Sequence, residues 1–143
     1  MKTYRLFIAL LLIAPSFACT SQSSEKKVNV TDSDSEKIEA YYFHFTARCT
    51  TCKTIEADAR KNLELLYPEK VKAGLISFQS LNLDDAINKP IAEKLGVSGQ
   101  TLLFVRGDQK INLTNEGFLY AVAKPEKFKE VIREKVDLLS LKK

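Results

Sequence analysis

The feature that most constrains this chain is a pair of cysteines, Cys49 and Cys52, placed where an apolar run gives way to a helical pattern. The run YYFHF, residues 41–45, has the composition of a buried strand, and a helix is expected from about residue 50. Two thiols at this spacing can close a disulfide with little chain movement. The positive end of the helix dipole favours the thiolate form of a cysteine placed there. The pattern therefore indicates thiol–disulfide chemistry.

Residues 1–18 have the pattern of an export signal. A short basic segment with Lys2 and Arg5 precedes nine apolar residues, 6–14, and small residues follow up to Ala18. A transmembrane helix needs about 20 apolar residues, so the apolar segment is too short to cross a bilayer. We predict a signal peptide that is removed on export.

Cys19 follows this signal directly, and two processing routes fit it. Ser16 and Ala18 satisfy the small-x-small rule of ordinary cleavage, whereas Ala18-Cys19 resembles a bacterial lipoprotein site. The chain has three cysteines, so pairing Cys49 with Cys52 leaves Cys19 as an odd thiol, which is unusual in an exported protein. We expect a lipid on Cys19 that binds the protein to a membrane; a free or mispaired N-terminal cysteine is the alternative.

The rest of the chain is expected to be a tether and one domain. Residues 19–37 are mostly Ser, Thr, Asp, Glu and Lys, and predict lipid attachment followed by a flexible spacer. Residues 38–143 are long enough for one domain with its own core. Losing Lys2 and Arg5 with the signal lowers the formal charge from +4 by two, to +2. Because no long basic run is present either, no nucleic-acid partner is expected.

The order of elements predicts an α/β domain with a central mixed four-stranded sheet. Strands are expected at residues 40–45, 75–83, 101–105 and 110–114, and helices at 50–66, at 89–95 and from 125 onward. The apolar side of the last helix is expected to be Phe128, Val131, Ile132, Val136 and Leu139. Heavy-metal-binding domains also place CxxC at a strand–helix junction. Their second and third strands form a hairpin directly after the first helix, unlike the β-α-β-α-β-β-α order predicted for this chain.

This combination of motif and element order resembles the thioredoxin-like superfamily over residues 38–141. The resemblance rests on Cys49 and Cys52, on the strand that follows the segment GVSG at residues 96–99, and on Gly117. Thioredoxins carry a glycine at that last place, where a backbone comes close to the dithiol. The resemblance implies a mixed sheet with helices on both faces and a redox-active disulfide.

Two segments, residues 42–61 and 111–118, resemble more narrowly a group of small exported Bacteroidota thioredoxin-like proteins. Automatic names for that group describe a nitrophenyl compound nitroreductase subunit linked to an arsenic operon. The two segments contain no feature specific to a nitro group, a flavin or arsenic. The fold and the dithiol are therefore what the resemblance contributes.

Several positions depart from the thioredoxin pattern. Thr50-Thr51 replaces Gly-Pro between the cysteines, and Arg48 replaces the aromatic residue before the first cysteine. Gln100 stands where a cis-proline precedes the third strand, and Phe43 stands where a buried aspartate shuttles protons. The last two departures concern substrate docking and proton transfer. A domain that kept the fold and lost turnover is therefore an alternative interpretation.

The two cysteines are expected to have different roles. Cys49 should lie exposed before the first helical turn, with Arg48 and Lys53 adding positive charge that stabilises its thiolate. Cys49 is the predicted nucleophile. Cys52 should be buried on the apolar face of the helix and should resolve the mixed disulfide that Cys49 forms.

Thr50 and Thr51 are supporting candidates. Their hydroxyls can donate hydrogen bonds to a thiolate, or Thr50 can simply cap the helix. The competing interpretation of the cysteine pair is a disulfide that only staples the helix start. A loop this short restricts the unfolded chain little, so a staple stabilises little.

His44, the only histidine, and two carboxylates are the remaining candidates. His44 is a candidate proton relay or third metal ligand. Strand alternation places it on the face opposite Phe43, and a strand histidine is more commonly packed or hydrogen-bonded without chemistry. Glu56 and Asp58 lie one turn into the helix, where a carboxylate can replace the missing aspartate. A solvated helix face is the preferred interpretation of both.

These features predict an exported thiol–disulfide oxidoreductase or electron relay, held at a periplasm-facing membrane. Its substrates would be cysteine-containing envelope proteins, and a reductive role also needs a membrane electron donor. No cofactor and no resident metal are expected. A soft-metal module, for example for copper, and a redox-inactive thioredoxin-fold adaptor are the alternatives; two cysteines make an incomplete zinc site.

Overall fold

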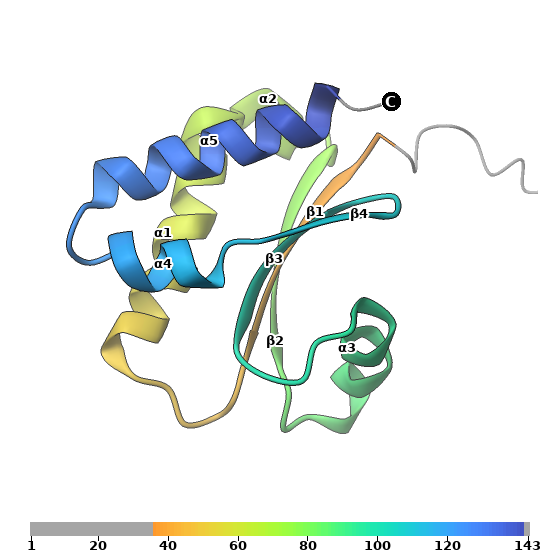
Figure 1. The fold of residues 1–143 in the computed structure, drawn as a ribbon. Helices are drawn as coiled ribbons and strands as arrows, with labels where there is room; N and C mark the ends of the chain where they lie inside the picture. Colours follow the sequence, from red (N-terminus) through yellow and green to blue (C-terminus); the bar gives the residue numbers. More distant parts are fainter. Residues whose placement is uncertain (1–35, 142–143) are drawn as a thin grey trace, which may run out of the picture.

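The computed structural model describes residues 36–141. The predicted signal peptide, Cys19 and most of the predicted spacer lie outside these residues. The described chain is an α/β fold in which helices flank a four-stranded mixed sheet (Figure 1). The predicted α/β class and mixed sheet are therefore confirmed. Between residues 36 and 141, no helix has the length and apolar character needed to cross a membrane.

Strand β1 lies inside the sheet. β1 (Ile38–His44) pairs in parallel with β2 (Ile76–Asn82) and antiparallel with β3 (Thr101–Arg106). β3 pairs antiparallel with β4 (Gln109–Asn112), so the strand order is β2-β1-β3-β4. A parallel pair needs a crossover connection, and the helical segment between β1 and β2 supplies it.

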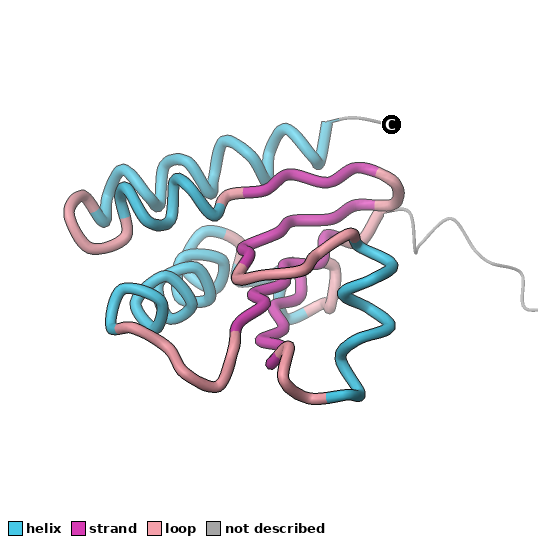
Figure 2. The backbone as a smooth tube through the Cα atoms, turned by 60° about the horizontal axis from the view of Figure 1, so that its bottom comes forward, coloured by secondary structure: helices cyan, strands magenta, loops and turns pink. Residues whose placement is uncertain are grey.

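Helices cover both faces of the sheet (Figures 1 and 2). Helices α1 (Thr50–Leu66), α4 (Thr114–Tyr120) and α5 (Pro125–Leu141) pack on one face, and α3 (Lys89–Leu95) packs on the other. The larger core includes Ala40, Tyr42, Ile55, Leu63, Leu102, Phe104, Phe128 and Ile132. The smaller core consists of Tyr41, Phe43, Ala92, Leu103 and Val105. Alternation along β1 thus sends consecutive aromatic side chains to opposite faces.

Helix α1 has the bounds that its sequence predicts. Its buried residues recur at helical spacing and form one stripe: Cys52, Ile55, Ala59, Asn62 and Leu63. The helix ends before Pro68, because proline lacks the N–H that continues a helix and disfavours helical geometry in the residue before it. A short helix that was not predicted, α2 (Pro68–Lys72), begins at the same proline, which is well suited to a first helical position.

The predicted helix at residues 89–95 and the β3–β4 hairpin are also present. A 3₁₀ turn, η1 (Ala86–Asn88), precedes α3. Gly96 ends α3 in the left-handed conformation with φ 73°, and Gly107 has φ 56° in the hairpin turn. Glycine adopts positive φ at little steric cost, which suits it to both positions.

The segment after β4 differs from the prediction. The fourth strand was expected to reach Thr114, but it ends at Asn112 and Thr114 begins α4. The side-chain oxygen of Asn112 accepts hydrogen bonds from the Thr114 backbone N–H at 2.9 Å and from Thr114 Oγ1 at 2.6 Å. This local turn competes with continued strand pairing. The predicted element order therefore lacked α2, η1 and α4, which are too short to show a clear period.

Gly117 brings α4 into close contact with α1. A Cβ atom at Gly117 would lie 3.0 Å from Ile55 Cγ2 and 3.4 Å from Ile55 Cδ1. Ile55 is buried one turn after Cys52. Gly117 thus lies within a helix, not just past a strand, and that helix packs on the one that carries the cysteines.

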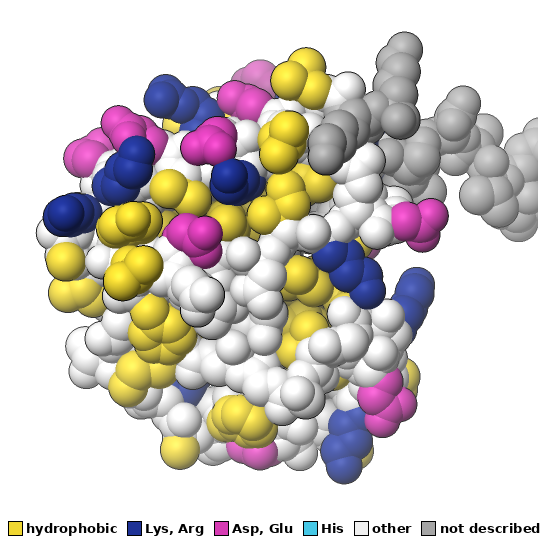
Figure 3. Space-filling model, viewed as in Figure 1, with side chains coloured by type: hydrophobic (Ala, Val, Ile, Leu, Met, Phe, Trp, Pro, Cys, Tyr) yellow, Lys and Arg dark blue, Asp and Glu magenta, His cyan; other side chains and the backbone are white. Residues whose placement is uncertain are grey.

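The sheet face under α3 is only partly covered. An open groove of about 640 Å³ lies between α3 and the β3–β4 turn, with Tyr41, Ile91, Lys94 and Asp108 among its lining residues. Figure 3 shows this hollow on the right of the molecule. The groove lies on the sheet face opposite α1, the helix that follows Cys49.

Gly117→Val is expected to lower the free energy of unfolding by about 1–3 kcal/mol, because the added side chain must displace Ile55 from a packed contact. Urea unfolding followed by circular dichroism measures the loss. Gly99→Val is the matched control, since a Cβ atom there meets nothing within 4 Å. The control should change the free energy by less than about 0.5 kcal/mol. Equal losses in the two variants would contradict the close contact.

Candidate functional site

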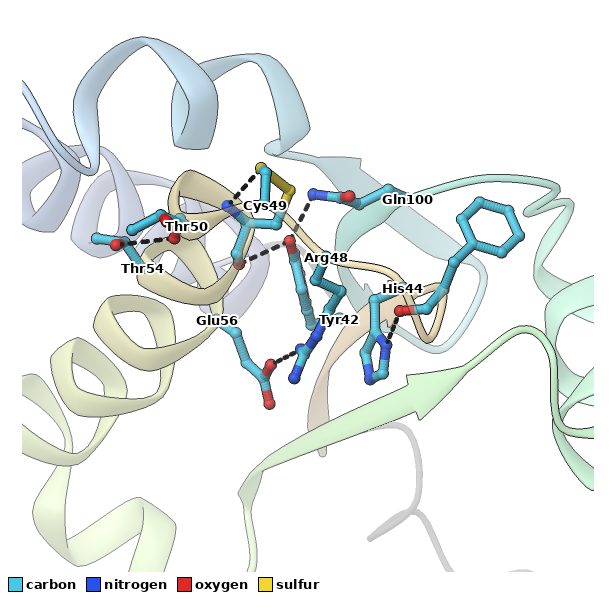
Figure 4. The surroundings of a disulfide bond; sticks show 10 residues. Tyr42, His44, Arg48, Cys49, Thr50, Thr54, Glu56 and Gln100 are labelled. Atoms are coloured by element: carbon cyan, nitrogen blue, oxygen red, sulfur yellow. Dashed lines mark hydrogen bonds and ion pairs between the residues drawn. A yellow bond between two sulfur atoms is a disulfide. The ribbon is translucent and has the colours of Figure 1, made fainter.

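Cys49 and Cys52 form a disulfide at the start of α1 (Figure 4). Their Cα atoms are 5.1 Å apart. The Cys49 side chain is exposed, whereas Cys52 is 5% exposed and belongs to the buried stripe of α1. One sulfur can therefore meet a large partner from solvent while the other is shielded, which is the asymmetry that the predicted roles require.

Cys49 is the N-cap residue of α1. Its backbone is extended, with φ −74° and ψ 164°, and its Sγ accepts a hydrogen bond from the Cys52 backbone N–H at 3.1 Å. No acidic side chain lies in the first turn of this 17-residue helix. The unsatisfied N–H groups and the helix dipole therefore act on the Cys49 sulfur without a nearby opposing carboxylate in that turn. The suggestion that Thr50 caps the helix is wrong, because the cysteine sulfur accepts the capping bond.

The other residues of the first turn lie close to this cap. The Lys53 side chain is exposed, and its backbone N–H donates to the Cys49 carbonyl at 3.2 Å. Thr50 is exposed, and its carbonyl accepts a hydrogen bond from Thr54 Oγ1 at 3.2 Å. Thr51 is half-buried. Lys53 is thus the cationic side chain that the first turn itself contributes near Cys49.

Arg48 is directed towards a carboxylate and away from the sulfurs (Figure 4). Its guanidinium forms an ion pair with Glu56, with 22% of the Arg48 side chain and 18% of the Glu56 side chain exposed. Arg60 also lies 3.8 Å from this carboxylate. The Arg48 charge is therefore largely balanced by Glu56. The interpretation of Glu56 as a solvated surface carboxylate is wrong, because the ion pair and β2 cover most of it.

The surroundings of Glu56 favour its ionised form. Burial acts to raise the pKa of Glu56, but hydrogen bonds from Ser80 and Arg48, and the charges of Arg48 and His44, together hold that pKa below its ordinary value. The ion pair links the loop before Cys49 to the helix after it. Arg48 and Glu56 thus hold the loop that leads into the disulfide.

Two residues that the sequence analysis did not name as site residues, Tyr42 and Gln100, lie against the disulfide-bearing turn (Figure 4). The Tyr42 hydroxyl donates to the Cys52 carbonyl oxygen at 2.9 Å and accepts a hydrogen bond from Gln100 Nε2 at 2.6 Å. Tyr42 is 0% exposed, and this burial raises its pKa to about 12. The hydroxyl is therefore neutral at physiological pH.

Strand alternation is the sequence signal that indicates which face of the sheet Tyr42 lies on. Ala40 and Tyr42 face the core under α1, whereas Phe43 faces α3. The position matched to the buried aspartate of thioredoxins thus points away from the helix that carries Cys52. In the sequence Gln100 differs from the thioredoxin pattern only by replacing a proline, and no pattern indicates which strand residue it contacts.

His44 lies at the end of β1, away from the sulfurs (Figure 4). Its Nδ1 is 2.9 Å from the Phe45 carbonyl oxygen, and its ring lies 6.2 Å from that of Tyr42 between centroids. Its strand face is the predicted one. Among residues 36–141, no group of three or more His, Cys, Asp or Glu side chains is arranged to hold a metal ion. His44 and a carboxylate therefore do not complete a zinc site with the cysteines.

Exposed apolar side chains gather on the helix that packs beside the start of α1. Phe118 and Leu119 of α4 are 46% and 62% exposed, and Val122 just after it is 60% exposed. Phe45, in the loop before Cys49, is 41% exposed. Figure 3 shows hydrophobic side chains on the left of the molecule, where Figure 1 places α4 and the start of α1.

Comparison with known proteins adds little to this geometry. No protein-family model matches the chain, and no curated protein matches it. Among solved structures, the chain is similar to one described as "Structure of a malarial protein", with 14% sequence identity and a TM-score of 0.44. The similarity covers 69% of this chain and 96% of that one. At this TM-score the similarity assigns neither a fold family nor an activity.

Glu56→Gln is expected to lower the free energy of unfolding by about 1 kcal/mol at neutral pH, because Arg48 loses its ionic partner. The folded-state pKa of Glu56 is depressed, so its stabilisation is present above the ordinary value of 4.5 and is lost as the pH falls through the folded-state pKa. The difference between wild type and variant should therefore shrink in acid. Urea unfolding at neutral pH and well below pH 4.5 measures this.

Asp58→Asn is the matched control for this prediction. Asp58 lies on the same helix, and within residues 36–141 it forms no ion pair. The control should show neither the neutral-pH loss nor its pH dependence. A pH-independent effect of Glu56→Gln would contradict the ion-pair explanation.

Proposed function

We propose that this protein is an exported, membrane-tethered thiol–disulfide oxidoreductase or electron relay of the thioredoxin-like class. The observation that carries the proposal is the pairing of an exposed sulfur at the N-cap of a long helix with a buried sulfur one turn later. The N-cap position stabilises a thiolate, and exposure lets it reach a partner. The buried partner is protected from solvent reagents but lies within bonding distance.

The chain topology supports the thioredoxin-like assignment. The CxxC segment follows an inner strand, and the sheet order β2-β1-β3-β4 combines a parallel pair with an antiparallel hairpin. Helices lie on both faces. This is the arrangement that the resemblance implies for a minimal thioredoxin-like domain.

In the proposed reductive reaction, the Cys49 thiolate attacks one sulfur of a client disulfide. A bond forms between Cys49 and that sulfur, the client S–S bond breaks, and the other client sulfur leaves as a thiolate that takes a proton. Cys52, deprotonated, then attacks Cys49 Sγ and releases the second client thiol. Two electrons pass from the protein to the client, and the Cys49–Cys52 disulfide remains. The reverse sequence oxidises a client dithiol.

Electrostatics at the site support Cys49 as the attacking sulfur. The Cys52 N–H donates to Cys49 Sγ, and the first turn contains Lys53 but no acidic residue. Arg48 contributes less than its position in the sequence indicates, because Glu56 balances its charge. The helix terminus is therefore the main source of positive potential at this sulfur.

A protein client fits the surface around the site better than a small molecule does. Phe118, Leu119 and Val122 leave an apolar surface on and next to α4, and Gly117 seats that helix against α1. Apolar surface of this kind is typical of contacts between proteins. Cysteine-containing envelope proteins are the proposed clients, and a reductive role would take electrons from a membrane donor.

Redox titration tests the function directly. The chain carrying Cys19→Ser is equilibrated in graded thiol/disulfide buffers, and its free thiols are alkylated and counted by intact mass. We expect a reversible two-electron transition, with Cys49 alkylated faster than Cys52 because only Cys49 is exposed. Cys52→Ser should accumulate a mixed disulfide on Cys49, whereas the matched Cys49→Ser should not. Cysteines that stay reduced, or that resist reduction throughout, would sink the proposal and favour the soft-metal or adaptor alternatives.

Membrane fractionation tests the tether. In a Gram-negative host, wild-type protein is expected in the membrane fraction, and Cys19→Ser should move it to the soluble periplasmic fraction, because the acyl chains supply the membrane affinity. A Cys49→Ser, Cys52→Ser double variant is the control and should stay with the membrane. Membrane association that survives Cys19→Ser would contradict the lipid anchor.

A further inference from the structure

Gln100, Tyr42 and Cys52 form a hydrogen-bonded chain with a fixed direction. The Cys52 carbonyl can only accept, so the single hydroxyl proton of Tyr42 points to it across 2.9 Å. The hydroxyl oxygen then accepts from Gln100 Nε2 at 2.6 Å. The chain therefore starts at the segment before β3 and ends on the backbone of the buried cysteine.

The hydrogen bond from Tyr42 to Cys52 is additional to the backbone hydrogen bonds that α1 makes within itself. In an α-helix each carbonyl accepts the N–H four residues ahead, which for Cys52 is that of Glu56. The Tyr42 bond is a second contact to that carbonyl, made by a side chain that is 0% exposed. It therefore adds to the helix's own hydrogen bonds, at the residue that forms the disulfide with Cys49.

Three elements meet at the Tyr42 hydroxyl (Figure 4). Tyr42 comes from β1, which is paired on both edges, Cys52 from α1, and Gln100 from the segment before β3. In the oxidised protein the S–S bond also restrains the turn that carries Cys52. After reduction that restraint is gone, and the Tyr42 bond remains as a directional polar contact between this turn and the central strand.

We infer that Tyr42 and Gln100 are positioning residues that keep Cys52 within reach of Cys49 in the reduced protein and so favour disulfide formation. The inference rests on the proposed function, because the pair must cycle between two states. Tyr42 does not act as a proton donor to sulfur, since its one proton faces the carbonyl. Removing the hydroxyl should let the reduced turn move more freely, and closing the disulfide would then cost more entropy.

Oxidation by glutathione disulfide isolates this effect. The Cys49 thiolate attacks glutathione disulfide, forms a mixed disulfide and releases one glutathione thiolate. The Cys52 thiolate then attacks Cys49 Sγ and releases the second glutathione thiolate. The two protons from the cysteines end on the two glutathiones, and two electrons pass to them. Positioning of Cys52 acts on the second step.

Tyr42→Phe removes the hydroxyl and keeps the ring in the core. Tyr41→Phe is the matched control, because Tyr41 is the neighbouring residue, is 3% exposed and faces the other core. Each variant, in the chain carrying Cys19→Ser, is equilibrated with glutathione and its disulfide. Intact mass after alkylation counts the dithiol, mixed-disulfide and disulfide forms.

In Tyr42→Phe, the equilibrium constant for disulfide formation should fall about 3- to 10-fold, and the mixed disulfide on Cys49 should accumulate. Tyr41→Phe should change the constant by less than about twofold. Gln100→Leu should act in the same direction as Tyr42→Phe, and it keeps the test decisive if Tyr42→Phe does not fold. The double variant should lose no more than Tyr42→Phe alone, because both residues belong to one chain.

A bond with only a structural role would lower the stability of both redox states equally and leave the equilibrium constant unchanged. Equal constants for Tyr42→Phe and Tyr41→Phe, in a protein whose wild type cycles, would therefore overturn the positioning role and leave the proposed function intact. A wild type with no reversible transition would overturn both.

Discussion

Strand β1 pairs with β2 along one edge and with β3 along the other, and its side chains are buried against helices on both faces. Every other element is placed relative to this strand. The parallel pairing with β2 requires the α1–α2 crossover, so α1 must begin just beyond the end of β1 and return along the sheet. Cys49 lies at the end of the link between β1 and α1, and Cys52 lies in the first turn of α1, so the location of both follows from the way the central strand is buried.

The same burial explains why the two sulfurs differ. Helix α1 turns one stripe of side chains to the sheet, and Cys52 belongs to that stripe together with Ile55 and Ala59. Cys49, just before the helix, is not part of the stripe and stays exposed. Because the sulfur of an N-cap residue lies at the positive end of the helix, exposure and electrostatic stabilisation fall on the same atom. A pair of cysteines of this kind is suited to exchange with a partner, whereas a structural staple needs neither property.

Less positive charge acts on Cys49 than the linear sequence indicates. Arg48 precedes Cys49 directly, yet its guanidinium pairs with Glu56, four residues after Cys52. The ion pair holds the incoming loop on the helix and balances the positive charge of Arg48 with a carboxylate. Gly117 lets α4 contact Ile55 of α1. Apolar side chains of α4 stay exposed beside this contact. The site thus combines the N-terminus of α1, the loop before Cys49 that the ion pair holds, and the exposed apolar side chains of α4.

Local periodicity in the sequence predicts the α/β class, the mixed sheet, the bounds of α1 and α3, and the burial of the α5 stripe. The sequence also locates the two cysteines at a strand–helix junction and predicts their unequal exposure. The partner that Arg48 takes, the bond from Tyr42 to Cys52 and the bond from Gln100 to Tyr42 exist only in the packed fold. Those outcomes depend on contacts between residues up to 58 positions apart, which no local pattern specifies. The cysteine pair is thus encoded by two adjacent segments, and its immediate surroundings are assembled by the fold.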